Sequence, residues 1–114
     1  MTNIIIYKSQ DVFVGFKSSG HADFNKNGEY DIVCAAISIL TQGLYFSLIE
    51  NCDICEKEIY SKQKDGFLEI KLDYNKAENI KVQSNFEFMI TGLKLLEAQY
   101  SDYINLEMME VQRW

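Results

Sequence analysis

The residues best suited to chemistry in this chain are its only histidine, His21, and a cysteine that follows 13 positions later, Cys34. A cysteine acts as a nucleophile at neutral pH when a nearby base or a helix N-terminus converts its thiol into a thiolate. Asp31 has a side chain preferred at helix starts, and capping there places Cys34 at the third helical position. The positive end of the helix dipole is then expected to hold the pKa of the thiol below its ordinary value of ~8.5.

The pair predicts a catalytic site of the Cys-His kind. His21 is expected to take the thiol proton and later to protonate a departing amine. The backbone N–H groups of Cys34 and Ala35 are expected to stabilise a tetrahedral oxyanion. A residue that orients the imidazole is not evident, although Asp23 and Asp31 are both close in the sequence.

Three residues near the cysteine are candidates for substrate binding, namely Asp31, Ala35 and Ser38. Ser38 lies one helical turn after Cys34 on the same face, and its hydroxyl either hydrogen-bonds into the site or satisfies a backbone carbonyl. The spacing also fits a structural reading, in which Cys34 is a small buried residue and His21 a surface residue.

The other two cysteines, Cys52 and Cys55, have a Cys-x-x-Cys spacing that suggests a metal or redox site. Cys34 and Cys52 are 18 positions apart, which is roughly 27 Å along a helix and excludes a shared zinc site. The pair follows a helix end, where no dipole lowers a thiol pKa. We expect two structural thiols and neither metal nor cofactor, with a thiol-redox protein as the least favoured alternative.

The elements that must position the histidine and the first cysteine follow from the periodicity of apolar residues. Residues 4–7 and 12–16 are rich in β-branched and aromatic residues, which predicts a hairpin that leads into the histidine. The polar segment 22–30 is expected to be a mobile loop able to close over a ligand. Residues 31–50 have helical spacing and predict the helix that begins near Cys34.

The second half of the chain predicts another hairpin, another helix and a final strand. Strands are expected at 54–63 and 67–73, joined by a turn at Asp65-Gly66. A helix is expected at 75–100 and a strand at 104–110. The resulting order ββαββαβ predicts a single α+β domain, residues 1–114, with two helices packed on a mostly antiparallel sheet.

The overall charge limits the classes of partner. The chain has 17 acidic and 11 basic residues and a net charge of -6, which argues against direct nucleic-acid binding and favours a cationic partner. No apolar run approaches the ~20 residues of a membrane helix, and residues 1–9 lack signal-peptide features. We therefore expect a cytoplasmic protein without a membrane partner.

Four segments carry a resemblance to a known family. They are Gly20-His21-Ala22, Gly28-Glu29-Tyr30, the run Asp31-Ile32-Val33-Cys34-Ala35-Ala36-Ile37-Ser38, and Leu40-Thr41-Gln42-Gly43. Together they closely resemble the ribosomal-processing cysteine protease family, called Prp. The segment between His21 and Cys34 is longer than is usual in that family.

The resemblance implies a small α+β domain that forms homodimers and acts as a cysteine endopeptidase. It implies removal of an N-terminal extension from a large-subunit ribosomal protein by cleavage after an aromatic residue, with Cys34 as nucleophile and His21 as proton donor and acceptor. The negative net charge suits a basic substrate of this kind, which we expect to dock as an added strand beside the sheet. The alternative is a catalytically silent, dimeric peptide-binding module associated with ribosome assembly.

Overall fold

The computed structural model describes residues 1–25 and 31–114. Its strands are β1 (Thr2–Ser9), β2 (Val12–Ser19), β3 (Ile59–Lys64), β4 (Phe67–Leu72) and β5 (Ile104–Glu110). Its helices are α1 (Ile32–Asn51), the short 3-10 helix η1 (Glu56–Glu58), α2 (Tyr74–Ala77) and α3 (Ile80–Gln99).

The five strands form one mixed sheet in the order β3-β4-β2-β1-β5. The hairpins β1–β2 and β3–β4 are antiparallel, β2 pairs antiparallel with β4, and β5 lies parallel to β1. The predicted α+β class and the order ββαββαβ are therefore confirmed. The topology places β3 and β5 at the two edges of the sheet.

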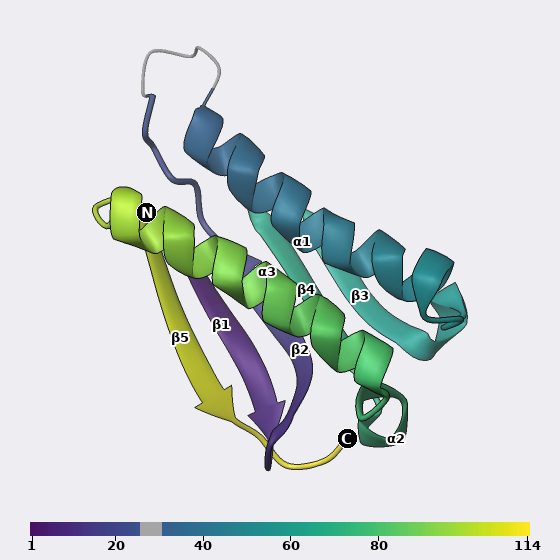
Figure 1. Cartoon of the computed structure of the whole chain (residues 1–114). Helices are drawn as coiled ribbons and strands as arrows, with labels where there is room; N and C mark the ends of the chain where they lie inside the picture. The colour runs from purple at the N-terminus through teal and green to yellow at the C-terminus, as the bar shows by residue number, and fades with distance from the viewer. Residues whose placement is uncertain (26–30) are drawn as a thin grey trace.

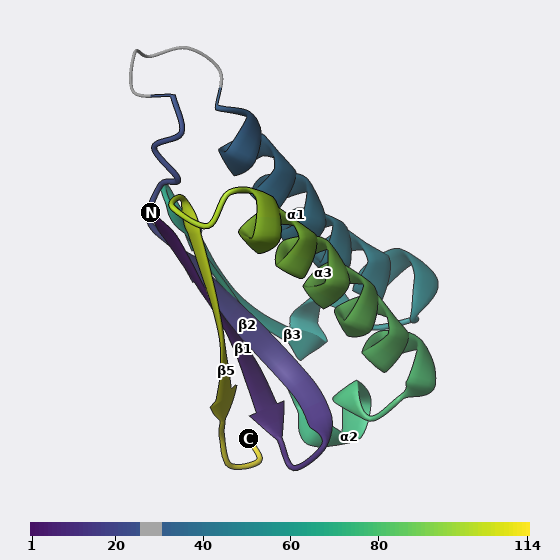
Figure 2. The ribbon, with the colours of Figure 1, turned by 60° about the vertical axis from the view of Figure 1, so that its left-hand side comes forward.

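The two long helices, α1 and α3, lie side by side on one face of the sheet (Figures 1 and 2). Their inward stripes are apolar, and each helix buries those side chains against alternating residues of the central strands. The core contains, among others, Ile4, Ile6, Phe16, Leu48, Ile70, Phe86 and Leu93. As a result, α1 is held above β3 and β4, while α3 lies nearer to β1 and β5 (Figure 1).

Two elements differ from their predictions because of local capping. The helix expected at 75–100 is divided into α2 and α3, since the extended backbone of Asn79 interrupts it and the Asn79 side chain accepts a hydrogen bond from the N–H of Lys81 at 2.8 Å. The strand expected at 54–63 begins only at Ile59. Residues 56–58, just before the strand, form η1. The Glu58 carboxylate accepts a hydrogen bond from the N–H of Cys55, the residue that precedes this short helix.

Helix α1 also corrects the expectation that no apolar run reaches membrane-spanning length. By length and composition α1 is apolar enough to cross a membrane, with a mean hydropathy of 1.9 over its best window. The core helix of a globular domain has the same properties, and one stripe of α1 is buried on the sheet: Val33, Ile37, Thr41, Leu44 and Leu48. The outward stripe of α1 is also apolar, and its side chains Ile39 and Phe46 are exposed.

Candidate active site

Helix α1 begins where the sequence predicted, and its first turn is fixed by Asp31. The Asp31 carboxylate oxygen Oδ1 accepts hydrogen bonds from the N–H groups of Val33 and Cys34, each at 3.0 Å. This satisfies two of the backbone donors that every helix start leaves free. Cys34 therefore sits in the first turn of α1, partly buried.

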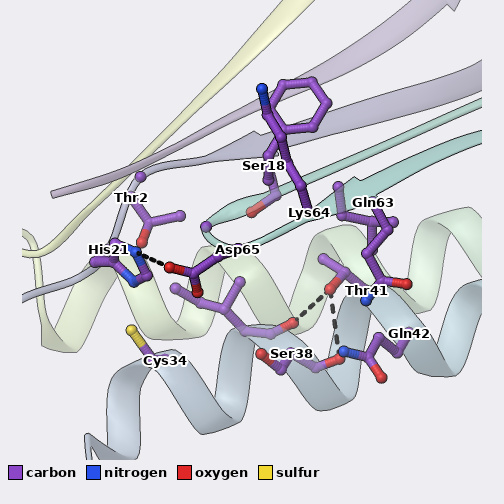
Figure 3. A pocket seen from close by; sticks show the side chains of 15 residues that line it. Thr2, Ser18, His21, Cys34, Ser38, Thr41, Gln42, Gln63, Lys64 and Asp65 are labelled. Carbon is purple, nitrogen blue, oxygen red and sulfur yellow. Dashed lines mark hydrogen bonds and ion pairs between the residues drawn. The ribbon is translucent and has the colours of Figure 1, made fainter.

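His21 follows directly from the end of β2. Gly20 lies between them at a φ of +91°, where a Cβ would be 2.6 Å from the carbonyl oxygen of Met1, so the turn requires glycine. The imidazole is 56% exposed, and its Nε2 lies 3.8 Å from the Asp65 carboxylate in the β3–β4 turn. Figure 3 shows the imidazole near the sulfur of Cys34 at one end of a pocket, with Asp65 beside it.

His21 and Cys34 line the same cleft, which has a volume of about 390 Å³. One wall is the face of α1 that carries Cys34 and Ser38, and the other is formed by β4 and the β3–β4 turn. In the part of the chain that the structure describes, no hydrogen bond joins the imidazole to the thiol. The fold thus brings the predicted pair to one cavity, open to a substrate.

The segment after His21 is attached to the start of α1. The N–H of Ala22 donates to the sulfur of Cys34 at 3.3 Å, and the N–H of Phe24 donates to Asp31 Oδ2 at 3.0 Å. The Phe24 ring also packs edge-on against Tyr100 and Tyr103. Residues 22–25 of the predicted mobile loop are therefore anchored, and residues 26–30 lie outside the described part.

The predicted depression of the Cys34 pKa is wrong for the free protein. Burial raises the pKa of the Cys34 thiol, and the negative charge of Asp31 acts in the same direction. The hydrogen bond from Ala22 lowers the pKa, but it does not compensate for these two effects. The helix start was expected to be electropositive, but its capping carboxylate places an anion beside the sulfur.

The Asp31 carboxyl has a lowered pKa because several backbone N–H groups donate to it. Burial acts to raise the pKa of the Asp31 carboxyl, but backbone N–H donors together outweigh burial and lower it. The donors are Cys34, Phe24, Asn25 and Val33.

The two N–H groups predicted to stabilise an oxyanion already have acceptors. The N–H of Cys34 donates to Asp31 Oδ1, and the N–H of Ala35 donates to the Asp31 carbonyl, each at 3.0 Å. The two predicted oxyanion donors are not free in this structure.

The other predicted site residues fall in distinct places. Ser38 lines the cleft, as its spacing from Cys34 suggested. Asp31 and Ala35 belong to the helix cap, and Asp23 lies 3.7 Å from the N-terminal ammonium rather than at the imidazole. Sequence reasoning missed Asp65, whose only signal was its place in a predicted Asp-Gly turn far along the chain.

Cys52 and Cys55 lie at the opposite end of α1 from Cys34. Cys52 caps the C-terminus of the helix, where Asn85 Nδ2 donates to its sulfur at 3.5 Å, and Cys55 is exposed before η1. Burial raises the pKa of the Cys52 thiol. Within residues 1–25 and 31–114, no three His, Cys, Asp or Glu side chains gather closely enough to hold a metal ion.

Comparison with known proteins agrees with this geometry. SMU.848 from Streptococcus mutans has 28% sequence identity and a TM-score of 0.78, over 97% of this chain and 96% of that one. An essential ribosomal processing protease Prp from S. aureus, in complex with a covalently linked product peptide, has 24% identity and a TM-score of 0.79. The match covers 96% of this chain and 100% of that one. The same S. aureus protease with a substrate peptide gives a TM-score of 0.76. No curated protein matches the chain.

A family model described as Cysteine protease Prp matches residues 1–105. The match covers both sides of the cleft, including the histidine, the cysteine and the β3–β4 turn. The chain therefore belongs to the Prp family of cysteine proteases.

Proposed function

We propose that this cysteine protease cuts a single bond in the N-terminal segment of a basic protein of the large ribosomal subunit, with Cys34 as nucleophile and His21 as acid and base. The observation that carries the proposal is the placement of both side chains in one open cleft of about 390 Å³. The S. aureus relative, an essential ribosomal processing protease with a covalently linked product peptide, supports the substrate class.

The proposed mechanism has two steps. First, His21 accepts the thiol proton as Sγ of Cys34 attacks the scissile carbonyl carbon; the C–N bond then breaks, and His21 protonates the departing amine. In the second step, water attacks the carbonyl carbon of the thioester and gives a proton to His21. The C–S bond then breaks, the acid product leaves, and His21 returns the proton to the sulfur of Cys34. The N–H groups of Cys34 and Ala35 are held by Asp31, whereas the N–H of Ala22 donates to the reacting sulfur itself, so we assign oxyanion stabilisation to Ala22.

A second cavity of about 270 Å³ extends the cleft between α1 and β3. The two cavities share Gln42, Gln63 and Leu68. Tyr45 adds aromatic surface to the second cavity, which suits an apolar or aromatic side chain of the substrate. An extended peptide fits such a groove, and the free backbone of the edge strand β3 offers it hydrogen bonds.

The test is mass spectrometry of a synthetic peptide that copies the N-terminal extension and the first mature residues of the large-subunit ribosomal protein. We expect cleavage at one bond after an aromatic residue. A peptide of the same composition in scrambled order is the control and is expected to stay intact. Tight binding of the first peptide without any cleavage would instead favour the silent peptide-binding module.

We further propose a homodimer that works in the cytoplasm, where its proposed substrate is made. Support for the dimer comes from the outer faces of α1 and α3, which expose Ile39, Phe46, Phe88 and Leu95. In each helix the two residues are seven positions apart and so share one stripe. A groove of about 250 Å³ between the helices, lined by Ile39 and Phe88 among others, gives these side chains a complementary surface in a second copy.

Light scattering tests the dimer. We expect a mass near twice 13.2 kDa for the wild type and near 13.2 kDa for Phe88→Glu, because a carboxylate on this apolar face loses its hydration in the interface. Met109→Glu on β5 changes an exposed apolar residue on a different element and is expected to leave the dimer intact. A monomeric wild type at high concentration would contradict the proposal.

A further inference from the structure

The turn between β3 and β4 is the part of the molecule that holds the histidine from the side opposite α1. The Asp65 carboxylate oxygen Oδ2 lies 3.8 Å from Nε2 of His21. Figure 3 shows Asp65 directed at the imidazole within the pocket, whereas Lys64, its neighbour in the chain, extends away from Cys34. A residue more than 40 positions along the chain thus meets the histidine.

Gly66 holds the same turn against the histidine segment by its backbone. Its carbonyl accepts a hydrogen bond from the N–H of Gly20 at 2.8 Å. A Cβ on Gly66 would lie 2.8 Å from Nε2 of His21, and the φ of +69° also favours glycine. The imidazole therefore rests directly on the turn, and any side chain at Gly66 would displace it.

The carboxylates that the sequence suggested as partners of the imidazole are used elsewhere. Asp31 caps α1, and Asp23 faces the N-terminal ammonium. The titratable or charged groups that line the cleft together with His21 are Cys34 of α1 and Lys64 and Asp65 of the hairpin. Among these groups, Asp65 is therefore the anion that faces Nε2.

We propose that Asp65 is a positioning residue for the reaction: its carboxylate and the backbone of Gly66 set the orientation of the His21 imidazole. The proposal rests on the proposed role of His21 as the proton carrier. It also links substrate binding to the histidine, because Gln63, Phe67 and Leu68 of the same hairpin line the cleft. A peptide seated there contacts the element that holds the base.

The experiment compares Asp65→Asn with the wild type by NMR and by kinetics. The single histidine gives one set of ring resonances, so the imidazole can be followed without assignment. Loss of the carboxylate removes the group that faces Nε2, and we expect changed ring resonances and a lower kcat with little change in KM. The pair is exposed, so the expected loss in kcat is roughly 1.5- to 5-fold, and it shrinks in high salt.

Asp11→Asn is the matched control. Asp11 lies in the other hairpin turn, is fully exposed, and faces Lys8 at 4.0 Å, so this change removes the same charge far from the cleft. We expect wild-type ring resonances and kcat in the control, and restoration of both in Asp65→Glu. Equal ring resonances and equal kcat for Asp65→Asn and Asp11→Asn would overturn the proposal.

Gly66→Asn tests the steric part of the proposal. Asparagine tolerates a positive φ better than other side chains, so the variant keeps the turn and adds the Cβ beside Nε2. We expect kcat to fall roughly 10- to 100-fold with little change in KM, because a small misplacement of a catalytic base is costly. An unchanged kcat with changed ring resonances would overturn this part.

The NMR comparison separates this inference from the proposed function. If the wild type cuts no peptide, the proposed function fails, while changed ring resonances in Asp65→Asn still support the pairing. If cleavage proceeds and the ring resonances and kcat of Asp65→Asn equal those of the wild type, the inference fails and the proposed function stands.

Discussion

Replacing Cys34 with alanine is expected to abolish peptide cleavage, with a loss in kcat/KM of about 10³-fold or more. Among the described residues, Cys34 is the only thiol that lines the cleft with His21. Without it, no thioester forms, and the remaining groups offer only binding. Peptide affinity is expected to remain near the wild-type value, because alanine removes one sulfur atom and leaves the groove unchanged. Mass spectrometry of the peptide and of the protein measures both cleavage and the covalent intermediate.

The controls for this variant are Cys52→Ser and Cys55→Ser. Both cysteines lie at the far end of α1 and outside the cleft. Each variant is expected to cleave the peptide at nearly the wild-type rate. Cleavage by Cys34→Ala at a comparable rate would assign the nucleophile to another residue and contradict the mechanism.

The parts of the fold that the sequence predicted well have local causes. The start of α1 depends on the side chain of Asp31, and the β3–β4 hairpin depends on the Asp65-Gly66 turn. Each signal acts within a few residues and is visible in the sequence. The family resemblance, carried by the segments around His21 and Cys34, was confirmed for the same reason, since both motifs are short and contiguous.

The missed parts depend on contacts between distant segments. The parallel pairing of β5 with β1 joins the two ends of the chain, and no local pattern specifies it. Asp65 was missed as a neighbour of His21 for the same reason, because β2 and β4 must pair before the turn meets the histidine. The break before α3 had a local cause, the Asn79 cap, but the apolar spacing around it obscured that signal.

The prediction of a lowered Cys34 pKa was wrong because Asp31 has two effects. Its capping side chain predicted the start of the helix and hence the position of the thiol. The same carboxylate, ionised and hydrogen-bonded to the first turn, raises the thiol pKa together with burial. In the free protein the raised pKa favours the protonated thiol, which is consistent with the proposal that His21 removes the proton during the reaction.

Asp31→Ala is the second variant with a large expected effect, because this carboxylate joins the two halves of the site. Loss of the cap is expected to lower the free energy of unfolding by about 0.5 to 2 kcal/mol. It also frees the N–H of Phe24 and so loosens the segment that follows His21. We expect kcat to fall roughly 10- to 100-fold from the resulting misplacement of the imidazole. Denaturant titration and peptide cleavage measure the two effects.

Asn79→Ala distinguishes the two roles of Asp31. Asn79 caps α3 through a hydrogen bond to the N–H of Lys81 and does not line the cleft. Its replacement is expected to cost similar stability and to leave kcat unchanged, so equal losses of kcat in both variants would show that helix capping alone explains the Asp31 effect.

The pH dependence of the stability gives a second check. Because the folded pKa of Asp31 is lowered, its stabilising contribution is present above the unfolded pKa of ~3.9 and is lost as the pH falls through the folded value. The stability difference between the wild type and Asp31→Ala should therefore narrow in acid, whereas the difference for Asn79→Ala should not follow this titration.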